Sequence, residues 1–323
     1  MKALQFARFG EPADVVALSE IPKPEPGSGE VRVRVRLAPI HNHDLATIRG
    51  IYGVKPPLPA IGGSESAGVV DALGEGVDGI AVGTRVALGA RGTWTEYVTL
   101  PAASLLPVPP NVPDEIAAQL VAMPLSAVVL LDELRVRAGD WIVQNAANGA
   151  VGRTLMRAAQ KAGINVINLV RRESAAEELR SFGAQHAVVQ EGKWAERVRD
   201  IAGTNAIARV VDSLCDQNSI ALNRLLGPGG EHVVFGALGK SPLSVDPGAL
   251  IFGQTVVRGF WMIAWMTSAS ESQRRDAIGR CVAMAAAGEL ALAAASVHPF
   301  SEAAEALREA ESPGRSGKVL LQA

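Results

Sequence analysis

The fold is decided by the stretch Trp141-Ile142-Val143-Gln144-Asn145-Ala146-Ala147-Asn148-Gly149-Ala150-Val151-Gly152. Residues 141–146 are apolar enough to predict a buried strand, and the small residues after them predict a tight turn. The following residues lack proline and predict a helix over 150–163. This succession places the unsatisfied N–H groups and partial positive charge of a helix N-terminus at the turn, where they attract an anion.

Strands and helices continue to alternate after this unit. The predicted order is strand 165–170, helix 174–182, strand 186–189, helix 193–202, and strands 208–212 and 231–235. Such alternation predicts an α/β fold with a doubly wound parallel sheet, the Rossmann arrangement. A dinucleotide would then contact the Gly-rich turn through Asn148, Gly149, Ala150, Val151 and Gly152. Because Ala150 takes one usual glycine position, a turn without a ligand is the alternative.

The end of the second strand indicates which dinucleotide binds. NAD-binding domains usually place a carboxylate there to bind the ribose 2′-hydroxyl. This chain has Leu169-Val170-Arg171-Arg172 instead. Guanidinium groups match a phosphate bidentately, so Arg171 and Arg172 predict NADPH as the cofactor. A solvated arginine pair at a helix start is the alternative, and Glu173, one residue later, complicates the interpretation.

The first third of the chain has a different sequence pattern. Residues 30–36, Glu-Val-Arg-Val-Arg-Val-Arg, alternate with period two and predict a half-exposed strand with a basic outer face. Short strands between proline-rich turns predict an irregular β-rich region up to about residue 117. The apolar run 116–131 and the Ala-rich run 282–295 each predict a packed helix, and 317–321 a final strand.

Composition excludes several classes of protein. The net charge is −2 with no basic block, so nothing points to nucleic acid. No run reaches the ~20 apolar residues of a membrane span, and the N-terminus lacks the apolar run of a signal peptide. Two cysteines, Cys215 and Cys281, exclude a disulfide framework and suit the cytoplasm.

Taken together, these features resemble the medium-chain dehydrogenase/reductase superfamily over essentially the whole chain. The resemblance implies a GroES-like, β-rich catalytic domain over 1–117 and 259–323 and a Rossmann NADPH-binding domain over 118–258. It also implies a homodimer, for which 255–258 is the expected edge strand. Zinc-dependent members use Cys and His ligands and a four-Cys lobe, whereas this chain has His41 and Ser64 at the ligand positions. No metal is therefore expected, and His41 and His43 are expected to be structural or solvated.

Three segments look like the 2-enoyl thioester reductases of the mitochondrial fatty-acid-synthesis type. They are 44–53 with 58–65, 144–148 leading into the turn, and 250–252 with 258–261. The resemblance implies that Tyr52 polarises the thioester carbonyl or assists protonation of the enolate. The alternative is a packing tyrosine, as expected for Tyr97.

Further roles follow from the same resemblance. Cofactor contacts are expected from Phe235, Gly236, Ala237, Leu238, Phe260, Trp261, Met262 and Lys318, and the substrate pocket from Tyr52, Met123 and Trp261. Core aromatics and a surface lysine are the alternatives. Met123 stands where the family usually has an asparagine, so it cannot supply that amide hydrogen bond to the nicotinamide side.

The leading hypothesis is NADPH-dependent reduction of an α,β-unsaturated carbonyl compound, a 2-enoyl thioester in particular. The alternatives are a quinone or small-enone oxidoreductase, a non-enzymatic NADPH-binding protein, and a zinc alcohol dehydrogenase.

Overall fold

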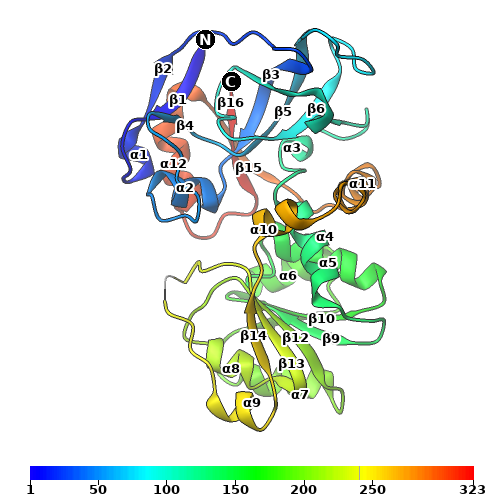
Figure 1. Ribbon diagram of the computed structural model, residues 1–323. Coiled ribbons are helices and arrows are strands. Elements are labelled where there is room, and N and C mark those ends of the chain that lie inside the picture. Colours follow the sequence, from blue (N-terminus) through cyan, green and yellow to red (C-terminus); the bar gives the residue numbers. More distant parts are fainter. Residues whose placement is uncertain (240) are drawn as a thin grey trace. The chain divides into compact units, whose positions relative to one another are not determined.

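The computed structural model describes residues 1–239 and 241–323. The chain forms two compact units, the first with two sheets and the second with one (Figure 1). Unit 1 comprises Met1–Met123 and Cys281–Ala323, and unit 2 comprises Pro124–Arg280. The sequence interpretation placed the corresponding boundaries at 118 and 259. The two units are described separately below.

Unit 1 is built mainly from strands. The smaller sheet contains β1 (Lys2–Phe6), β2 (Val16–Glu20) and β4 (Ala60–Ile61). The larger sheet contains β3 (Glu30–Pro39), β5 (Glu65–Leu73), β6 (Arg85–Gly89), β7 (Tyr97–Pro101), β8 (Leu106–Pro107), β15 (Ala294–Pro299) and β16 (Lys318–Gln322). Its order is β15-β16-β3-β5-β6-β8, with β7 also paired to β3. The last strand, β16, thus lies between β15 and β3, and its residues 319–321 are fully buried.

Strand β3 corrects one expectation. Val31, Val33 and Val35 are buried as the alternation predicts. Arg32, expected on a basic outer face, is also buried, because its Nε lies 2.6 Å from Asp71 and its Nη1 2.6 Å from a Glu25 carboxylate oxygen. Only Arg34 and Arg36 on this strand face solvent. Paired charges allow an arginine to be buried where its stem packs against the sheet.

Unit 1 also contains several short helices. They are α1 (Pro12–Val15), α2 (Asn42–Ile48), η1 (Ala102–Ser104), α3 (Asp114–Ala117), η2 (Phe300–Glu302) and α12 (Ala303–Glu311). Helix α11 (Glu271–Ala286) contains the boundary between the units. Leu4, Phe6 and Trp94 pack with Leu307 of α12 and Leu321 of β16 in one core, so the C-terminal segment completes the N-terminal sheet.

Unit 2 is a parallel sheet with helices on both faces. Its strands are β9 (Trp141–Gln144), β10 (Asn165–Val170), β11 (His186–Val189), β12 (Ile207–Asp212), β13 (Leu226–Val234) and β14 (Val256–Gly259). Every pairing is parallel, in the order β11-β10-β9-β12-β13-β14. The direction of winding reverses between β9 and β12. This is the topological switch point, at which doubly wound sheets bind their ligands.

Unit 2 also contains helices, most of which connect these strands. They are α4 (Met123–Leu134), α5 (Ala150–Lys161), α6 (Glu173–Ser181), α7 (Trp194–Ala202), α8 (Ser219–Asn223), α9 (Pro247–Ile251) and α10 (Met262–Ser268). Separate apolar clusters cover the two faces of the sheet, one around Trp194 and Leu222 and the other around Leu130 and Leu155. The predicted doubly wound parallel sheet is therefore confirmed.

Two predicted helices are wrong in extent. The run 116–131 does not form one helix, because α3 ends at Ala117 and α4 begins only at Met123. Pro124 prevents one helix from continuing through this segment, since it has no N–H to donate to the preceding turn. The Ala-rich run 282–295 contains only the last turn and a half of α11, which ends at Ala286 before Gly288 with φ of +68°. Its final residues enter β15.

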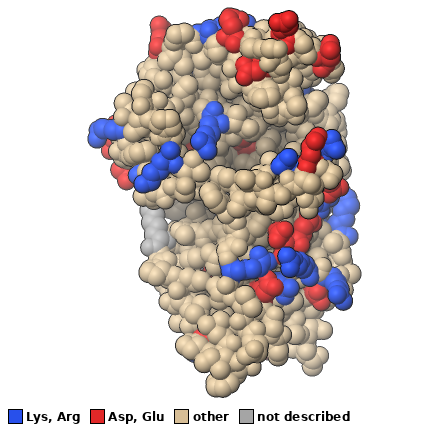
Figure 2. Space-filling model, in the orientation of Figure 1, with Lys and Arg blue, Asp and Glu red and all other residues tan. Residues whose placement is uncertain are grey.

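Charged side chains of both signs are intermixed over the face shown in Figure 2, with no extended basic surface on that face. Within the described residues, no helix has the length and apolarity needed to cross a membrane.

Candidate functional site

The Gly-rich turn leads from β9 into α5 as the sequence predicts. Gly149 is the N-cap of α5, and its N–H donates to the Ala146 carbonyl at 2.9 Å. The first N–H groups of such a helix have no partners within the helix. Because α5 has three full turns, it presents both those donors and a partial positive charge at this point.

Gly152 is required by close packing. A Cβ added there would lie 2.6 Å from the Ala147 carbonyl oxygen and 2.7 Å from its Cα, so no side chain fits without moving the backbone. The Gly152 carbonyl in turn accepts a hydrogen bond from Gln144 Nε2 at 2.9 Å. Gly149 is less constrained, since the nearest atom to a Cβ would be 3.3 Å away. Gly152 thus holds the helix against the turn that follows β9.

Arg153 was missed by the sequence analysis. It is 3% exposed and donates from Nε to the Asn148 carbonyl at 2.7 Å, while its Nη2 lies 2.7 Å from Glu178 of α6. Its guanidinium lies over the Phe182 ring at 4.8 Å. These contacts fix the turn from beneath. In the sequence, Arg153 looks like any arginine within a helix. Only its position five residues after Asn148 could have indicated that it contacts the carbonyl of the turn.

A buried polar network fixes the switch point. Asp212, at the end of β12, accepts hydrogen bonds from Asn145 after β9, from His232 of β13 at 3.0 Å, and from the N–H groups of Leu214 and Cys215. Burial raises the pKa of Asp212, but these hydrogen bonds, led by His232, outweigh it and lower the pKa to about 2. The carboxylate therefore stays ionised and joins three neighbouring strand ends.

The arginine pair predicted to select the cofactor lines a cavity. Arg171 and Arg172 follow β10, are exposed, and border an open cavity of about 920 Å³ together with Arg180 and Arg197. Glu173, which complicated the sequence interpretation, is 2.7 Å from Arg180 Nη1. Neither Arg171 nor Arg172 forms an ion pair with the described part of the chain. Their guanidinium groups are therefore available to an anion.

The other predicted cofactor segments lie at the same edge of the sheet. Residues 235–238 follow β13, where the Leu238 N–H donates to the Ser213 carbonyl at 3.0 Å. Residues 260–262 follow β14, with Trp261 as N-cap of α10 and 43% exposed. Phe235 and Phe260 are partly buried against the core. Because all the strands are parallel, these segments, the Gly-rich turn and the arginine pair follow carboxyl ends at one edge.

Unit 1 contains a second candidate centre, a buried polar cluster. His41 is completely buried, and its Nε2 lies 2.5 Å from Oε1 of Glu65, which is 1% exposed. Glu65 Oε2 accepts the N–H groups of Val121 at 2.9 Å and Ala122 at 2.7 Å. Asp44 Oδ2 accepts the His41 N–H at 2.9 Å and so caps α2. Residues 41, 65 and 121–122 are brought together only by the fold.

Burial sets the protonation states in this cluster. It raises the pKa of Glu65 to about 7, against the opposing effect of the Ala122 and Val121 N–H groups. It lowers the pKa of His41 well below 6.5, and the positive charges of Lys318 and His43 lower it further. Burial and Arg315 lower the pKa of Lys318 to about 8, although Asp44 and Glu65 act in the opposite direction. Lys318, predicted as a cofactor contact, thus interacts electrostatically with this cluster.

Tyr52 lies beside the same cluster. It is half-buried after α2, and its ring centroid is 5.8 Å from that of His43 at an interplanar angle of 32°. His43 stacks on His41 at 5.0 Å and 17°. Its Nε2 lies 2.6 Å from Ser64 Oγ and 3.5 Å from Asp44 Oδ1. The structure therefore brings Tyr52, His43 and Ser64 together.

The remaining predicted residues are placed as follows. Met123 is half-buried at the start of α4. Tyr97 lies in β7 with the Lys23 ammonium 3.7 Å above its ring, the packing role expected of it. Among the residues that the structure describes, His41 belongs to no group of three possible metal-ligand side chains. Within residues 1–239 and 241–323, the only group of three His, Cys, Asp or Glu side chains whose ligand atoms lie within 4.8 Å of one another is His298, Glu302 and Glu305.

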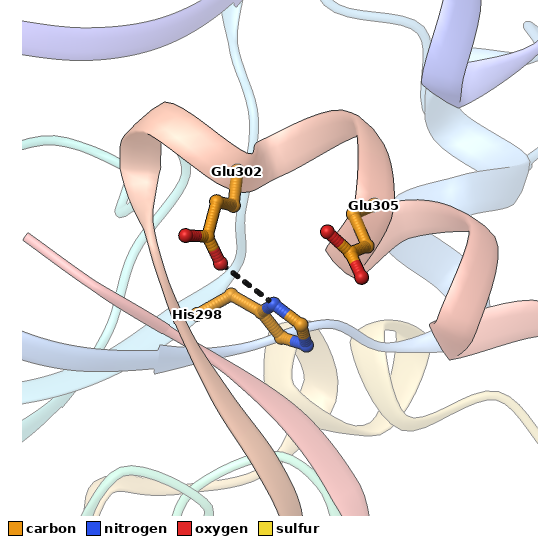
Figure 3. Close-up of side chains that lie close together, drawn as sticks. All are labelled: His298, Glu302 and Glu305. Carbon is orange, nitrogen blue, oxygen red and sulfur yellow. Dashed lines mark hydrogen bonds and ion pairs between the residues drawn. The ribbon is translucent and has the colours of Figure 1, made fainter.

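That group lies where β15 leads into α12 (Figure 3). His298 Nδ1 is 3.3 Å from Glu302, and its Nε2 is 2.7 Å from Glu309. The hydrogen bond to Glu309 raises the pKa of His298 above its usual value, and burial only partly opposes this. Both ring nitrogens are thus engaged by carboxylates. The arrangement is that of an ion-pair cluster joining β15 to α12.

Comparison with known proteins agrees with both units. Residues 27–110 match the family described as alcohol dehydrogenase GroES-like domain, and residues 150–276 match the family described as zinc-binding dehydrogenase. The chain is 32% identical over 329 aligned positions to a mitochondrial enoyl-[acyl-carrier-protein] reductase of Bos taurus, covering 99% of this chain and 88% of that protein.

Solved structures share the fold over the full length. A mycobacterial protein complexed with NADPH has a TM-score of 0.87 and 27% identity, with 100% of each chain covered. The quinone oxidoreductase of Escherichia coli complexed with NADPH has a TM-score of 0.89 and 24% identity, also with 100% of each chain covered. The second likeness bears on the fold alone.

Proposed function

This chain belongs to the medium-chain dehydrogenase/reductase superfamily and is an NAD(P)H-dependent oxidoreductase, and we propose that it uses NADPH to reduce the C=C bond of a 2-enoyl thioester. The observation that carries the proposal is Tyr52, a phenol placed beside the polar cluster of unit 1 in a chain 32% identical to an enoyl-[acyl-carrier-protein] reductase. Supporting it is the edge of the unit 2 sheet, where the predicted cofactor segments meet.

The residues of unit 2 fit the proposed cofactor. The α5 N-terminus offers donors for a pyrophosphate, and Gly152 keeps the helix close to the turn. Arg171 and Arg172 offer two guanidinium groups to the ribose 2′-phosphate, while Glu173 is engaged by Arg180. NADPH, when bound, supplies the hydride of the reaction. We expect Trp261, Met262 and residues 235–238 to contact it, with Lys318 and Met123 as further candidates.

Tyr52 accounts for the second half of the reaction. Hydride addition to Cβ of an enoyl thioester leaves negative charge on the carbonyl oxygen, which a positioned O–H donor stabilises as it develops. The same donor can give its proton to the enolate, so that the C=C bond becomes a saturated C–C bond. The Tyr52 side chain is half-buried.

The test is turnover of crotonyl-CoA, followed as NADPH oxidation at 340 nm. We expect the wild-type protein to turn over with NADPH much faster than with NADH. Tyr52→Phe should lower kcat by about 10²-fold, the usual range for loss of a general acid. Tyr97→Phe, in the same unit but in a packing position, is the matched control and should retain activity. Full activity of Tyr52→Phe would remove Tyr52 from the mechanism.

A quinone or small enone is the second candidate substrate, because a mycobacterial quinone oxidoreductase with 26% identity shares the whole fold. Parallel assays with crotonyl-CoA, a benzoquinone and a small enone separate the two. Reduction of the quinone alone would favour the second candidate and reject the enoyl thioester. Tight NADPH binding without turnover of any acceptor would instead favour a binding protein.

We also propose a homodimer formed through β14 of unit 2. This strand lies at the edge of its sheet, and unpaired edges invite pairing. Nearby apolar side chains are exposed: Phe252 to 87%, Ile251 to 61% and Val256 to 48%. Light scattering should give twice the chain mass, and Val256→Lys should give the monomer mass. A monomeric wild-type protein would contradict the proposal. We expect a cytoplasmic protein, in keeping with Cys215 and Cys281, neither of which forms a disulfide in the described part of the chain.

A further inference from the structure

The feature that the proposed mechanism leaves unused is His43. It occupies the first turn of α2, between the ring of Tyr52 on one side and the buried ring of His41 on the other. Its Nε2 lies 2.6 Å from Ser64 Oγ. The side chain is 24% exposed, so the imidazole has access both to solvent and to the tyrosine. An imidazole is the side chain best suited to exchange protons near neutral pH.

The imidazole of His43 is held in a fixed orientation. Stacking on His41 sets the plane of the ring, and His41 is itself held by Glu65. Ser64 and Asp44 both approach Nε2, at 2.6 and 3.5 Å. The Thr47 hydroxyl donates to the His43 carbonyl at 2.7 Å and fixes the backbone. A merely solvated histidine would not be held from so many directions.

The proposed chemistry creates a need for such a group. Once Tyr52 has given its proton to the enolate, a half-buried phenolate remains, and the next turnover cannot begin until it is protonated. Direct protonation by water is slow relative to transfer from a positioned acid. The ring centroids lie 5.8 Å apart, so the two side chains are neighbours, and the relay proposed below passes the proton between them directly or through one water. His43 is thus placed to return the proton.

We propose that His43 relays a proton from solvent to Tyr52 after each turnover, and that Ser64 and Asp44 hold the imidazole in position for this. The inference rests on the proposed function. Cβ receives the hydride and Cα receives the Tyr52 proton. The phenolate then gains a proton as an N–H bond of the His43 imidazolium breaks, and the neutral imidazole takes a proton from water. The sum is one enoyl thioester, one NADPH and one proton giving the saturated thioester and NADP⁺.

The test variant is His43→Gln, whose amide can still reach Ser64 but cannot carry the proton. We expect kcat with crotonyl-CoA to fall by about 10²-fold while KM changes little. The solvent deuterium isotope effect on kcat should increase, because proton return becomes rate-limiting. In a single turnover, the hydride-transfer rate should stay within about twofold of wild type. His298→Gln, another histidine of unit 1, is the control and should keep wild-type kcat.

Two further variants keep the relay testable if His43→Gln does not fold properly. His43→Ala should recover part of its lost kcat when imidazole is added to the buffer, and Ser64→Ala should show a smaller loss with an altered pH profile. The groups facing His43 that also shape this profile are His41, Asp44, Tyr52, Glu65 and Lys318.

The outcomes separate the two proposals. A wild-type protein that oxidises no NADPH with crotonyl-CoA would reject the proposed function, and the relay with it. An active wild type, with His43→Gln unchanged in kcat and isotope effect, would reject the relay alone. Loss of single-turnover hydride transfer in His43→Gln, without imidazole rescue of His43→Ala, would show a structural role and also overturn the relay.

Discussion

Glu65 gives the sharpest prediction about the buried cluster of unit 1. Replacing it with glutamine removes the ionisable group but keeps an oxygen that can accept the Val121 and Ala122 N–H groups. Because burial raises the pKa of Glu65 above its value in the unfolded chain, the folded state holds this proton more strongly. Stability is therefore greatest below the unfolded pKa and is lost as the pH rises through the folded value.

The size of this effect follows from the two pKa values. A rise from 4.5 to about 7 corresponds to about 3 kcal/mol of lost stability once Glu65 is fully ionised. Between pH 5 and pH 8 the Glu65→Gln variant should therefore gain about 2–3 kcal/mol relative to wild type. Glu65→Ala is the contrasting variant. It leaves two backbone donors without an acceptor and the ring Nε2 of His41 without its partner, and should cost about 3 kcal/mol or more at pH 5.

The measurement must report on unit 1, because a chain with two units need not unfold in one step. Urea unfolding can be followed by hydrogen–deuterium exchange in peptides that contain Trp94, which is fully buried in the unit 1 core. The difference in unfolding free energy between wild type and Glu65→Gln reports the titration of Glu65 alone, because the other titrating groups, His41 among them, are present in both proteins. If the two stability curves run parallel from pH 5 to 8, Glu65 does not titrate there and the argument from burial is refuted.

Three further predictions concern unit 2. Arg171→Ala and Arg172→Ala should each weaken NADPH binding about tenfold, as expected for loss of a charged phosphate contact, and leave NADH binding unchanged, which titration calorimetry can check. Gly152→Val should destabilise the protein by about 1–3 kcal/mol in thermal unfolding, because its Cβ would meet the Ala147 backbone at 2.6–2.8 Å; an unchanged Tm would contradict the packing argument. Asp212→Asn should cost about 2 kcal/mol at neutral pH, and this difference should vanish as the pH falls through the folded pKa of about 2; a constant difference would mean that the charge is not responsible.

The unit 2 site was largely predictable because its signals are local. The Gly-rich turn, the arginine pair and the strand–helix alternation each occupy one continuous stretch, so their period and spacing can be seen in the sequence. Parallel pairing then brings the separate segments to one edge without further information. Arg153 could not be predicted in this way, because its role depends on the contacts of its side chain with Asn148 and Glu178.

The unit 1 cluster could not be predicted in the same way. His41 and His43 were interpreted as structural or solvated, and nothing in the sequence joins His41 to Glu65 or to the segment before Met123. The contacts of Glu65 with His41 and with residues 121–122 form only when segments that are far apart in the chain come together in the fold. Arg32 shows the same limit, because period two placed it outside and only Asp71 and Glu25 explain its burial. The broken helix at 118–122 could have been anticipated from Pro124.

The place of β16 in the larger sheet also has a consequence for how the protein is made on the ribosome. Strand β3 is synthesised early, but its neighbour β16 emerges only after the whole of unit 2. At roughly 5–20 residues per second, β3 waits on the order of 15–60 s for that partner. Unit 2 is continuous in sequence and needs no such delay. Residues 37–39 of β3, which pair with β16, therefore remain unpaired on that side during this interval, a period in which a chaperone can protect this open edge from aggregation.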